Sequence, residues 1–155
     1  MQSGEIARRL RELEAACRSA GRPLTVQRRG VFEALLMLDN HPTADEVLAA
    51  VRNGIPNISR TTVYRILDDL VQMGVVRRIH HPGSAARYDG KIVRHHHLVC
   101  TSCGKVWDLE DPRLDRIPAP RDAAEFFEVH DFSVYFSGVC YECLKLQRGD
   151  KSGRP

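Results

Sequence analysis

The sequence predicts an α+β fold in two domains, a helical N-terminal domain over residues 1–90 and a small α/β domain over residues 91–155. Up to Gly74, apolar residues recur at intervals of three and four, which is the spacing of a buried helix face. After Gly90, apolar and polar residues alternate as they do in β-strands. Four of the five cysteines lie in this second part and form two C-x-x-C pairs, a pattern that favours a bound metal ion.

The overall composition is that of a globular protein, with 43% hydrophobic and 28% charged residues. No stretch approaches the ~20 apolar residues of a membrane span. The N-terminus is charged where a secretory leader would be apolar. We therefore expect a cytoplasmic protein with no membrane partner.

Positive charge is unevenly distributed along the chain. Residues 1–90 carry 13 Arg against 10 Asp and Glu, whereas residues 91–155 carry 10 charges of each sign. The excess in the first domain fits a nucleic-acid-binding face or an ordinary solvated surface.

Two helices are predicted at the N-terminus. The first covers residues 6–20, includes Cys17 on its apolar face, and ends at Gly21-Arg22-Pro23. The second begins at Thr25 and ends before the turn at residues 39–42. We expect Cys17 to belong to the core that these helices form.

Capping residues mark two further helices. Thr43, followed three residues later by Glu46, has the pattern of a capping box and predicts a third helix that runs to Gly54. Ser59 caps a fourth helix with a regular apolar stripe, and Gly74 ends it.

A basic hairpin follows the fourth helix. Residues 75–79 and 86–88 have the pattern of short strands around a turn at His81-Pro82-Gly83-Ser84. Helices followed by such a hairpin are the element order of a winged-helix domain. The hairpin carries Arg77, Arg78 and Arg87, which are candidates for phosphate contacts or for solvated strand charges.

The second domain is predicted from alternating segments at 98–99, 105–109, 126–129 and 132–136. Residues 111–120 are too rich in proline for a long helix. Residues 149–155 have the composition of a frayed tail.

The cysteine pairs Cys100/Cys103 and Cys140/Cys143 predict a closed four-thiolate site for structural Zn²⁺. The 36 residues between the pairs make a long spacer for a zinc ribbon, so strand pairing has to bring them together. The alternatives are a redox pair or buried free thiols.

A histidine cluster leads directly into the first cysteine pair. In a strand, His95 and His97 point to one face and His96 to the other. Asp89 and Asp108 are the nearest carboxylates in sequence, and His41 lies in a turn of the first domain. Nitrogen and oxygen ligands suit Fe(II), Mn(II) or Zn(II), and the alternative is a group of ordinary surface histidines.

Five strings occur in a fixed order along the chain. They are His41-Pro42-Thr43-Ala44-Asp45-Glu46-Val47, Ile58-Ser59-x-x-Thr62-Val63-Tyr64-Arg65-x-Leu67, Arg87-Tyr88-Asp89, His95-x-His97-x-x-Cys100-x-x-Cys103-Gly104-Lys105 and Gly138-x-Cys140-x-x-Cys143. Together they resemble the ferric uptake regulator family over about residues 20–145.

The resemblance implies a homodimeric, metal-activated repressor of transcription with a structural Zn²⁺ in the four-cysteine site and a regulatory Fe²⁺ or Mn²⁺ between the two domains. The partner is double-stranded operator DNA, with the fourth helix in the major groove. The regulatory ligands implied position by position are His41, Asp89, His95, His97 and Asp108. The implied DNA contacts are Ser59, Arg60, Thr61, Tyr64, Arg65, Arg77 and Arg78, although a tyrosine at this spacing also serves for packing.

Asp108 stands where the family's iron-uptake repressors have Glu and its peroxide-stress regulators have Asp. This implies a sensor in which bound Fe(II) reacts with hydrogen peroxide and an oxygen atom is added to His41 or His95. The alternative is an iron- or manganese-responsive uptake repressor that leaves DNA on metal loss. Zinc-uptake regulators have Cys at the position of Asp89, which weighs against zinc sensing.

A further metal site of many relatives would use Arg94, His96 and Asp115 together with a histidine where this chain has Phe132. We expect that site to be absent unless His130 substitutes. The open histidine and carboxylate shell also resembles non-haem iron enzymes, but no catalytic acid, base or substrate cleft is identifiable. We therefore expect no enzyme activity, and no small-molecule ligand apart from the metal ions and hydrogen peroxide. A purely structural zinc protein remains the last alternative.

Overall fold

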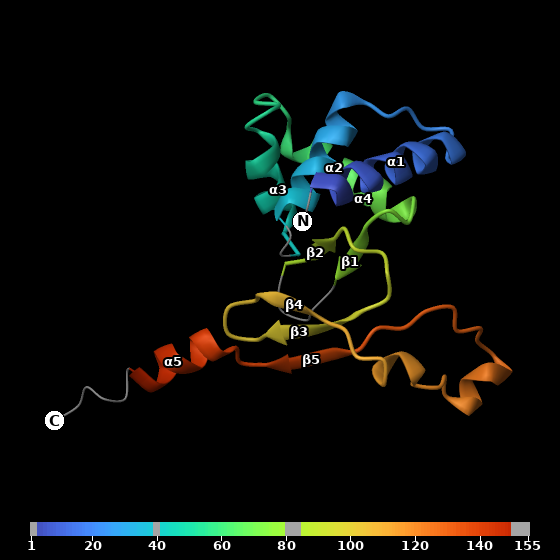
Figure 1. Cartoon of the computed structure of the whole chain (residues 1–155), viewed down its shortest axis with the longest axis vertical. Helices are drawn as coiled ribbons and strands as arrows, with labels where there is room; N and C mark the ends of the chain where they lie inside the picture. The colour runs from blue at the N-terminus through green and yellow to red at the C-terminus, as the bar shows by residue number, and fades with distance from the viewer. Residues whose placement is uncertain (1–2, 39–40, 80–84, 150–155) are drawn as a thin grey trace. The chain divides into compact units, whose positions relative to one another are not determined.

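The computed structural model describes residues 3–38, 41–79 and 85–149. They fall into two compact units, Met1–Ile92 and Val93–Pro155, each of which is described by itself. Figure 1 traces the helices of the first unit in blue to green and the sheet of the second in yellow to red. None of the described helices combines the length and the apolar character that crossing a membrane requires.

The first unit contains α1 (Ser3–Ser19), α2 (Val26–Leu38), α3 (Ala44–Val51) and α4 (Arg60–Gln72). All four predicted helices are therefore confirmed. The third ends at Val51, earlier than predicted, because the chain turns there and the amide of Gly54 donates to the carbonyl of Val51 at 3.1 Å. Gly74 adopts a φ of 71° after α4, a left-handed conformation that glycine adopts without strain.

Side-chain caps fix where two of these helices begin. Thr43 and Glu46 form the complete capping box before α3. The hydroxyl of Ser59 accepts a hydrogen bond of 3.0 Å from the amide of Thr62 at the start of α4. Each cap satisfies an amide that the helix leaves without an internal partner.

The core of the first unit comes from all four helices. Leu13, Phe32, Val47 and Leu67 are fully buried, and Cys17 packs with them, as predicted. Burial of these apolar faces is the main source of this unit's stability.

Arg9 is a buried cation within this core, only 2% exposed. Its guanidinium donates hydrogen bonds of 2.7 Å to the carbonyl oxygens of Val75 and Gly90, and it lies 5.7 Å from the centre of the Phe32 ring. It also pairs with Glu12. Arg9 therefore ties α1 to the end of α4 and to the segment that leaves the hairpin.

The predicted hairpin consists of β1 (Arg77–Ile79) and β2 (Arg87–Asp89), paired antiparallel. Its predicted turn at His81–Ser84 lies outside the described residues. The four helices and the hairpin thus follow the winged-helix order.

The second unit is built on a three-stranded sheet in the order β4-β3-β5 (Figure 1). The central strand β3 (His96–Cys100) pairs antiparallel with β4 (Val106–Leu109) and parallel with β5 (Tyr135–Gly138). α5 (Tyr141–Gly149) continues from the end of β5. Between β4 and β5 lie two short 3₁₀ helices, η1 (Leu114–Arg116) and η2 (Arg121–Glu125).

The strand predicted at residues 126–129 is wrong. This segment follows η2 with no regular structure, and Phe126 and Phe127 are 81% and 64% exposed. Alternation indicates a strand only where a neighbouring strand provides hydrogen bonds, and none does so here among the described residues. The next segment pairs later than predicted, from Tyr135 onward, and the hydrogen bond from the His97 amide to the Val134 carbonyl begins the backbone pairing with β3.

Replacing Arg9 by Met keeps an unbranched apolar stem but removes the donors to two buried carbonyl groups. We expect the free energy of unfolding of Arg9→Met to fall by roughly 2–4 kcal/mol, because buried charge-assisted hydrogen bonds are lost. Urea unfolding followed by helical circular dichroism measures this change. Arg11→Met, at an exposed position of the same helix, is the control and should change stability by less than about 0.5 kcal/mol. Equal stability of the two variants would show that the Arg9 contacts contribute nothing.

Candidate functional site

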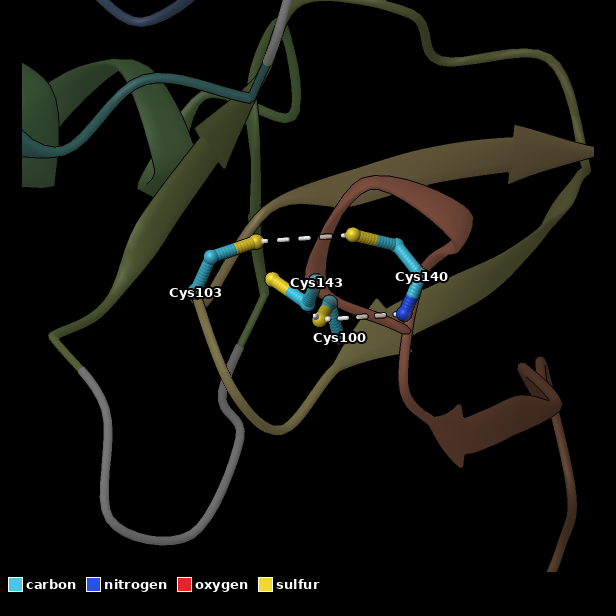
Figure 2. Close-up of side chains that lie close together, drawn as sticks. All are labelled: Cys100, Cys103, Cys140 and Cys143. Atoms are coloured by element: carbon cyan, nitrogen blue, oxygen red, sulfur yellow. Dashed lines mark hydrogen bonds between the residues drawn. The ribbon is translucent and has the colours of Figure 1, made fainter. Parts of the chain in front are cut away.

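The four paired cysteines come together at one end of the sheet in the second unit (Figure 2). Cys100 ends β3 and Cys103 lies in the turn that follows it, whereas Cys140 and Cys143 flank the start of α5. The Sγ atoms of Cys100 and Cys143 are 3.9 Å apart, as are those of Cys103 and Cys140. Thiolates at ~2.3 Å from one ion in a tetrahedron lie about 3.8 Å from each other, so the cluster fits a single divalent ion.

Pairing of β3 with β5 overcomes the long spacer between the cysteine pairs. Cys100 lies opposite Gly138, and the amide of Thr101 donates to the Gly138 carbonyl at 2.8 Å. Gly104 has a φ of 70°, which allows the tight turn after the first pair. The two knuckles are therefore held together by backbone hydrogen bonds of the sheet.

The surroundings of the cluster favour thiolate at one cysteine in particular. The backbone amide of Cys140 donates to the sulfur of Cys100 at 3.3 Å, and this lowers the pKa of Cys100 to about 6. A hydrogen bond from Ser102 favours the thiolate of Cys143, but its neighbouring thiols and burial outweigh it and raise the pKa to about 12. Metal ions bind thiolates, so an ion that took Cys143 as a ligand would displace the proton of its thiol.

The first unit contributes His41 and Asp89, a histidine and carboxylate pair. Both are buried, and His41 Nε2 lies 4.0 Å from an Asp89 carboxylate oxygen. His41 has a φ of 47°, and the segment after it is held against β2 by a hydrogen bond of 2.9 Å from the Tyr88 amide to the Pro42 carbonyl. The guanidinium of Arg87 donates to the His41 carbonyl at 2.9 Å.

The second unit contributes His95, His97 and Asp108. His97 lies opposite Asp108 in the pairing of β3 with β4, and the rings of His95 and His97 are 4.7 Å apart between centres. His95 Nε2 lies 3.3 Å from an Asp108 carboxylate oxygen. The two histidines therefore share a side of the strand, as predicted from alternation.

The ring of His95 is oriented by a hydrogen bond between its Nδ1 and the carbonyl of Val93 at 2.7 Å. A carbonyl only accepts, so Nδ1 is the nitrogen that donates in this hydrogen bond. Nε2 is the nitrogen nearest Asp108. A ligating imidazole typically has this arrangement, in which the second nitrogen is fixed by a backbone carbonyl.

Each unit thus brings an imidazole and a carboxylate to a separation that suits shared coordination. Two donors at about 2.1 Å from one ion lie roughly 3–4 Å apart, and both histidine–carboxylate distances, 3.3 Å and 4.0 Å, fall in this range. The donor atoms are nitrogen and oxygen, which Fe(II), Mn(II) and Zn(II) accept and Cu(I) does not favour.

His96 lies on the opposite side of β3 from His95 and His97. It is fully buried, its Nε2 lies 3.3 Å from Asp115, and its ring stacks on Phe132. Arg94 also lies over Phe132, and it pairs with Asp131 at 3.0 Å. His130, the residue considered as a substitute ligand, is 78% exposed on its side chain and pairs with Glu128.

Candidate DNA-contacting side chains lie mainly along α4. Ser59, Arg60, Thr61 and Arg65 are exposed. Tyr64 is partly buried against the core, yet its hydroxyl contacts Arg60 at 3.1 Å.

The hairpin arginines are engaged within the first unit. Arg78 pairs with Asp68 of α4 and lies 5.4 Å from the centre of the Tyr88 ring, and Arg77 is partly exposed. Arg87, predicted as a candidate for phosphate contact or a solvated strand charge, donates to the His41 carbonyl. Sequence patterns gave no signal for this role because the two residues are far apart along the chain.

Comparisons with known proteins agree with this architecture. The ferric uptake regulator family matches residues 19–137. The peroxide-responsive repressor PerR of Staphylococcus epidermidis is 34% identical over 138 residues, which are 89% of this chain and 92% of that protein. The structure of the Campylobacter jejuni peroxide stress regulator is 29% identical, with a TM-score of 0.65 over 86% of this chain and 98% of its own.

A zinc uptake regulator solved with zinc and DNA is 21% identical and covers 96% of this chain and 99% of its own, with a TM-score of 0.65. This likeness extends the shared fold over nearly the whole chain. The family match spans most of the sequence, and the similarity to a curated relative spans more. The chain therefore belongs to the ferric uptake regulator family, whose members are metal-dependent transcription regulators and not enzymes.

Proposed function

We propose that the chain is a homodimeric, metal-dependent repressor that senses hydrogen peroxide. A single regulatory ion takes His41 and Asp89 from the first unit and His95, His97 and Asp108 from the second. The protein acts on double-stranded operator DNA in the cytoplasm. The observation that carries the proposal is that each unit contains a buried histidine held 3.3–4.0 Å from a carboxylate.

The donor types assign an ion to each centre. Four thiolates suit structural Zn²⁺, whereas imidazole and carboxylate suit Fe²⁺ or Mn²⁺ as the regulatory ion. The aspartate at position 89, where a zinc-uptake regulator has Cys, argues against zinc as the regulatory ion, and the absence of sulfur argues against Cu(I).

Ligands from two units explain how binding can regulate. One ion that takes ligands from both units fixes their relative orientation, so the recognition helices of a dimer match the spacing of two half-sites. The exposed arginines of α4 and the basic hairpin fit the phosphate and base contacts of a winged-helix domain. The zinc uptake regulator with this fold was solved bound to DNA, which supports the same partner here.

Peroxide sensing is supported by the aspartate at position 108 and by similarity to PerR and to a peroxide stress regulator. A bound Fe(II) ion would supply the redox chemistry that breaks the O–O bond of hydrogen peroxide, with no net consumption of electrons from the ion. In the net change, one oxygen atom of peroxide is inserted into an imidazole C–H of His41 or His95, and the other leaves as water. The modified ring is a poorer ligand, so the two units are released from each other.

An iron- or manganese-responsive uptake repressor is the alternative. Such a repressor would bind its ion with the same five residues, and it would leave DNA when the ion dissociates. The histidines would then stay chemically intact.

The homodimer is supported by the apolar face of the second unit. Leu98, Trp107 and Phe136 lie side by side across the three strands and are 39–47% exposed. They line part of an open hollow of about 600 Å³. Figure 1 shows α5 continuing beyond β5 instead of lying across this face. A small domain buries few apolar side chains by itself. A second copy that covers this face would bury these three side chains, as exposed apolar patches at interfaces are buried.

Peroxide sensing is tested by loading the zinc-containing protein with Fe(II) without oxygen and adding a small excess of hydrogen peroxide. We expect one oxygen atom to be added to the peptide of His41 or His95, together with loss of DNA binding. Peptide mass spectrometry and a gel-shift assay measure the two effects, and the Mn(II)-loaded protein is the control that stays unmodified. Unmodified histidines with Fe(II)-dependent DNA binding intact would favour the iron-responsive alternative.

The four-thiolate site is tested with Cys140→Ser, which removes one of the four ligands. We expect the single tightly bound Zn²⁺ per chain to be lost and the thermal stability of the second unit to fall, because ion binding and folding are coupled. Native mass spectrometry counts the ions. Cys17→Ala, outside the cluster, should retain one Zn²⁺, and retention by both variants would refute the site.

The dimer is tested with Leu98→Asp, which places a charge in the middle of the apolar face. We expect self-association to weaken at least about 30-fold, the effect of disrupting a central interface residue. Sedimentation equilibrium measures the dissociation constant. Ile117→Asp, at a similarly exposed apolar residue directly after η1, serves as the control. A dimer of unchanged affinity in Leu98→Asp would place the interface elsewhere.

A further inference from the structure

Asp45 lies in the first turn of α3, and its exposed carboxylate faces the side chains of α4. One of its oxygens accepts a hydrogen bond from the Arg60 guanidinium at 3.0 Å. The other lies 3.4 Å from the hydroxyl of Tyr64. Arg60 and Tyr64 are themselves joined, by a hydrogen bond of 3.1 Å and by the guanidinium lying 5.3 Å from the ring centre. We call these three residues the Asp45 cluster.

The cluster uses residues from two helices that the core holds rigidly together. Arg60 and Tyr64 are one turn apart on α4, so their side chains lie along the same stripe of the helix. Residues of α3 and α4 pack in the same core, which fixes where Asp45 stands relative to this stripe. The side chains of Asp45 and Arg60 remain 59% and 64% exposed, so the cluster is at the surface and available to a ligand.

A carboxylate here is unexpected on electrostatic grounds. DNA presents a dense row of negative phosphates, and an exposed carboxylate beside the arginines of α4 weakens attraction to any sequence. The same carboxylate neutralises Arg60 and restrains a long, flexible side chain that would otherwise reach the nearest phosphate. Both effects lower affinity for DNA in general.

Although restraint of the Arg60 side chain lowers affinity for DNA in general, it raises selectivity for one DNA sequence over others. Base recognition depends on donors held in a fixed direction towards the edges of bases, whereas phosphate contact needs only positive charge. Asp45 holds the Arg60 guanidinium over the Tyr64 ring and also contacts the Tyr64 hydroxyl, so two candidate base-reading groups share one orientation. A preorganised pair loses less conformational freedom on binding its target.

We propose that Asp45 is a specificity-determining positioning residue for DNA recognition. It acts through Arg60 and Tyr64, suppressing binding to non-operator DNA and orienting these side chains for the operator. The inference rests on the proposed function, in which α4 binds operator DNA.

The test uses the Mn(II)-loaded dimer and two duplexes of equal length. One is selected by the wild-type protein from a random pool, and the other has the same composition in scrambled order. For Asp45→Asn we expect affinity for the scrambled duplex to rise on the order of threefold, with a steeper salt dependence of about one unit per protomer. The ratio of selected to scrambled affinity should fall about tenfold.

Two further variants separate positioning from charge and from folding. Glu14→Gln removes an equal charge from α1, where Glu14 pairs with Arg18 at 3.1 Å, and should leave the ratio unchanged. In an Arg60→Gln background, Asp45→Asn should lower the ratio less than it does in the wild type, because only the Tyr64 contact is left for Asp45 to position. The melting temperature of each variant is measured alongside, since Asp45 also stabilises the first turn of α3.

The outcomes are distinguishable. Weaker binding of Asp45→Asn to both duplexes by the same factor would mean a role in folding only and would overturn the inference. If Asp45→Asn and Glu14→Gln change the two affinities and their ratio equally, Asp45 acts only through its charge. That outcome would also overturn the inference. If the wild-type protein selects no duplex from the pool, the proposed function itself fails and the inference fails with it.

Discussion

The pairing of β3 with a neighbour on each side is the interaction on which the second unit depends. Its antiparallel neighbour β4 places Asp108 opposite His97, and its parallel neighbour β5 places the second cysteine pair beside the first. The backbone hydrogen bonds of one five-residue strand thus assemble both ligand groups of this unit. Alternation along β3 then keeps them apart, with His95 and His97 on one side and Cys100 on the other.

In the first unit the proposed ligands His41 and Asp89 are brought together by a contact between a turn and a strand edge. The His41 turn lies along β2, where the Tyr88 amide and the Arg87 guanidinium bind backbone carbonyls of the turn. His41 and Asp89, far apart in sequence, meet because Asp89 is the last residue of the same strand. Arg9 secures the next residue by binding the Gly90 carbonyl. The Arg9 hydrogen bond therefore ties the helical core to the residue that directly follows Asp89.

Much of this was predictable from sequence because the signals are local. Helix boundaries followed from Thr43, Ser59 and Gly74, whose side chains or backbone freedom act within a few residues. The cysteine cluster followed from the donor chemistry of two C-x-x-C pairs. The predicted strand at 126–129 failed because alternation carries no information on whether a partner strand is present. The contacts of Arg9, Arg87 and Asp45 were not predicted, because each joins residues 15 or more positions apart and leaves no periodic trace.

The distribution of donors between the units has a functional consequence under the proposed function. All four thiolates belong to the second unit, so an ion there stabilises a single fold and has no means of reporting a signal. The proposed imidazole and carboxylate donors are divided between the units, so binding one ion to all of them would orient one unit against the other. Each unit keeps its own sheet or helical core when that ion leaves. Under the proposed function, loss of a single imidazole would release the protein from DNA while each unit keeps its own fold.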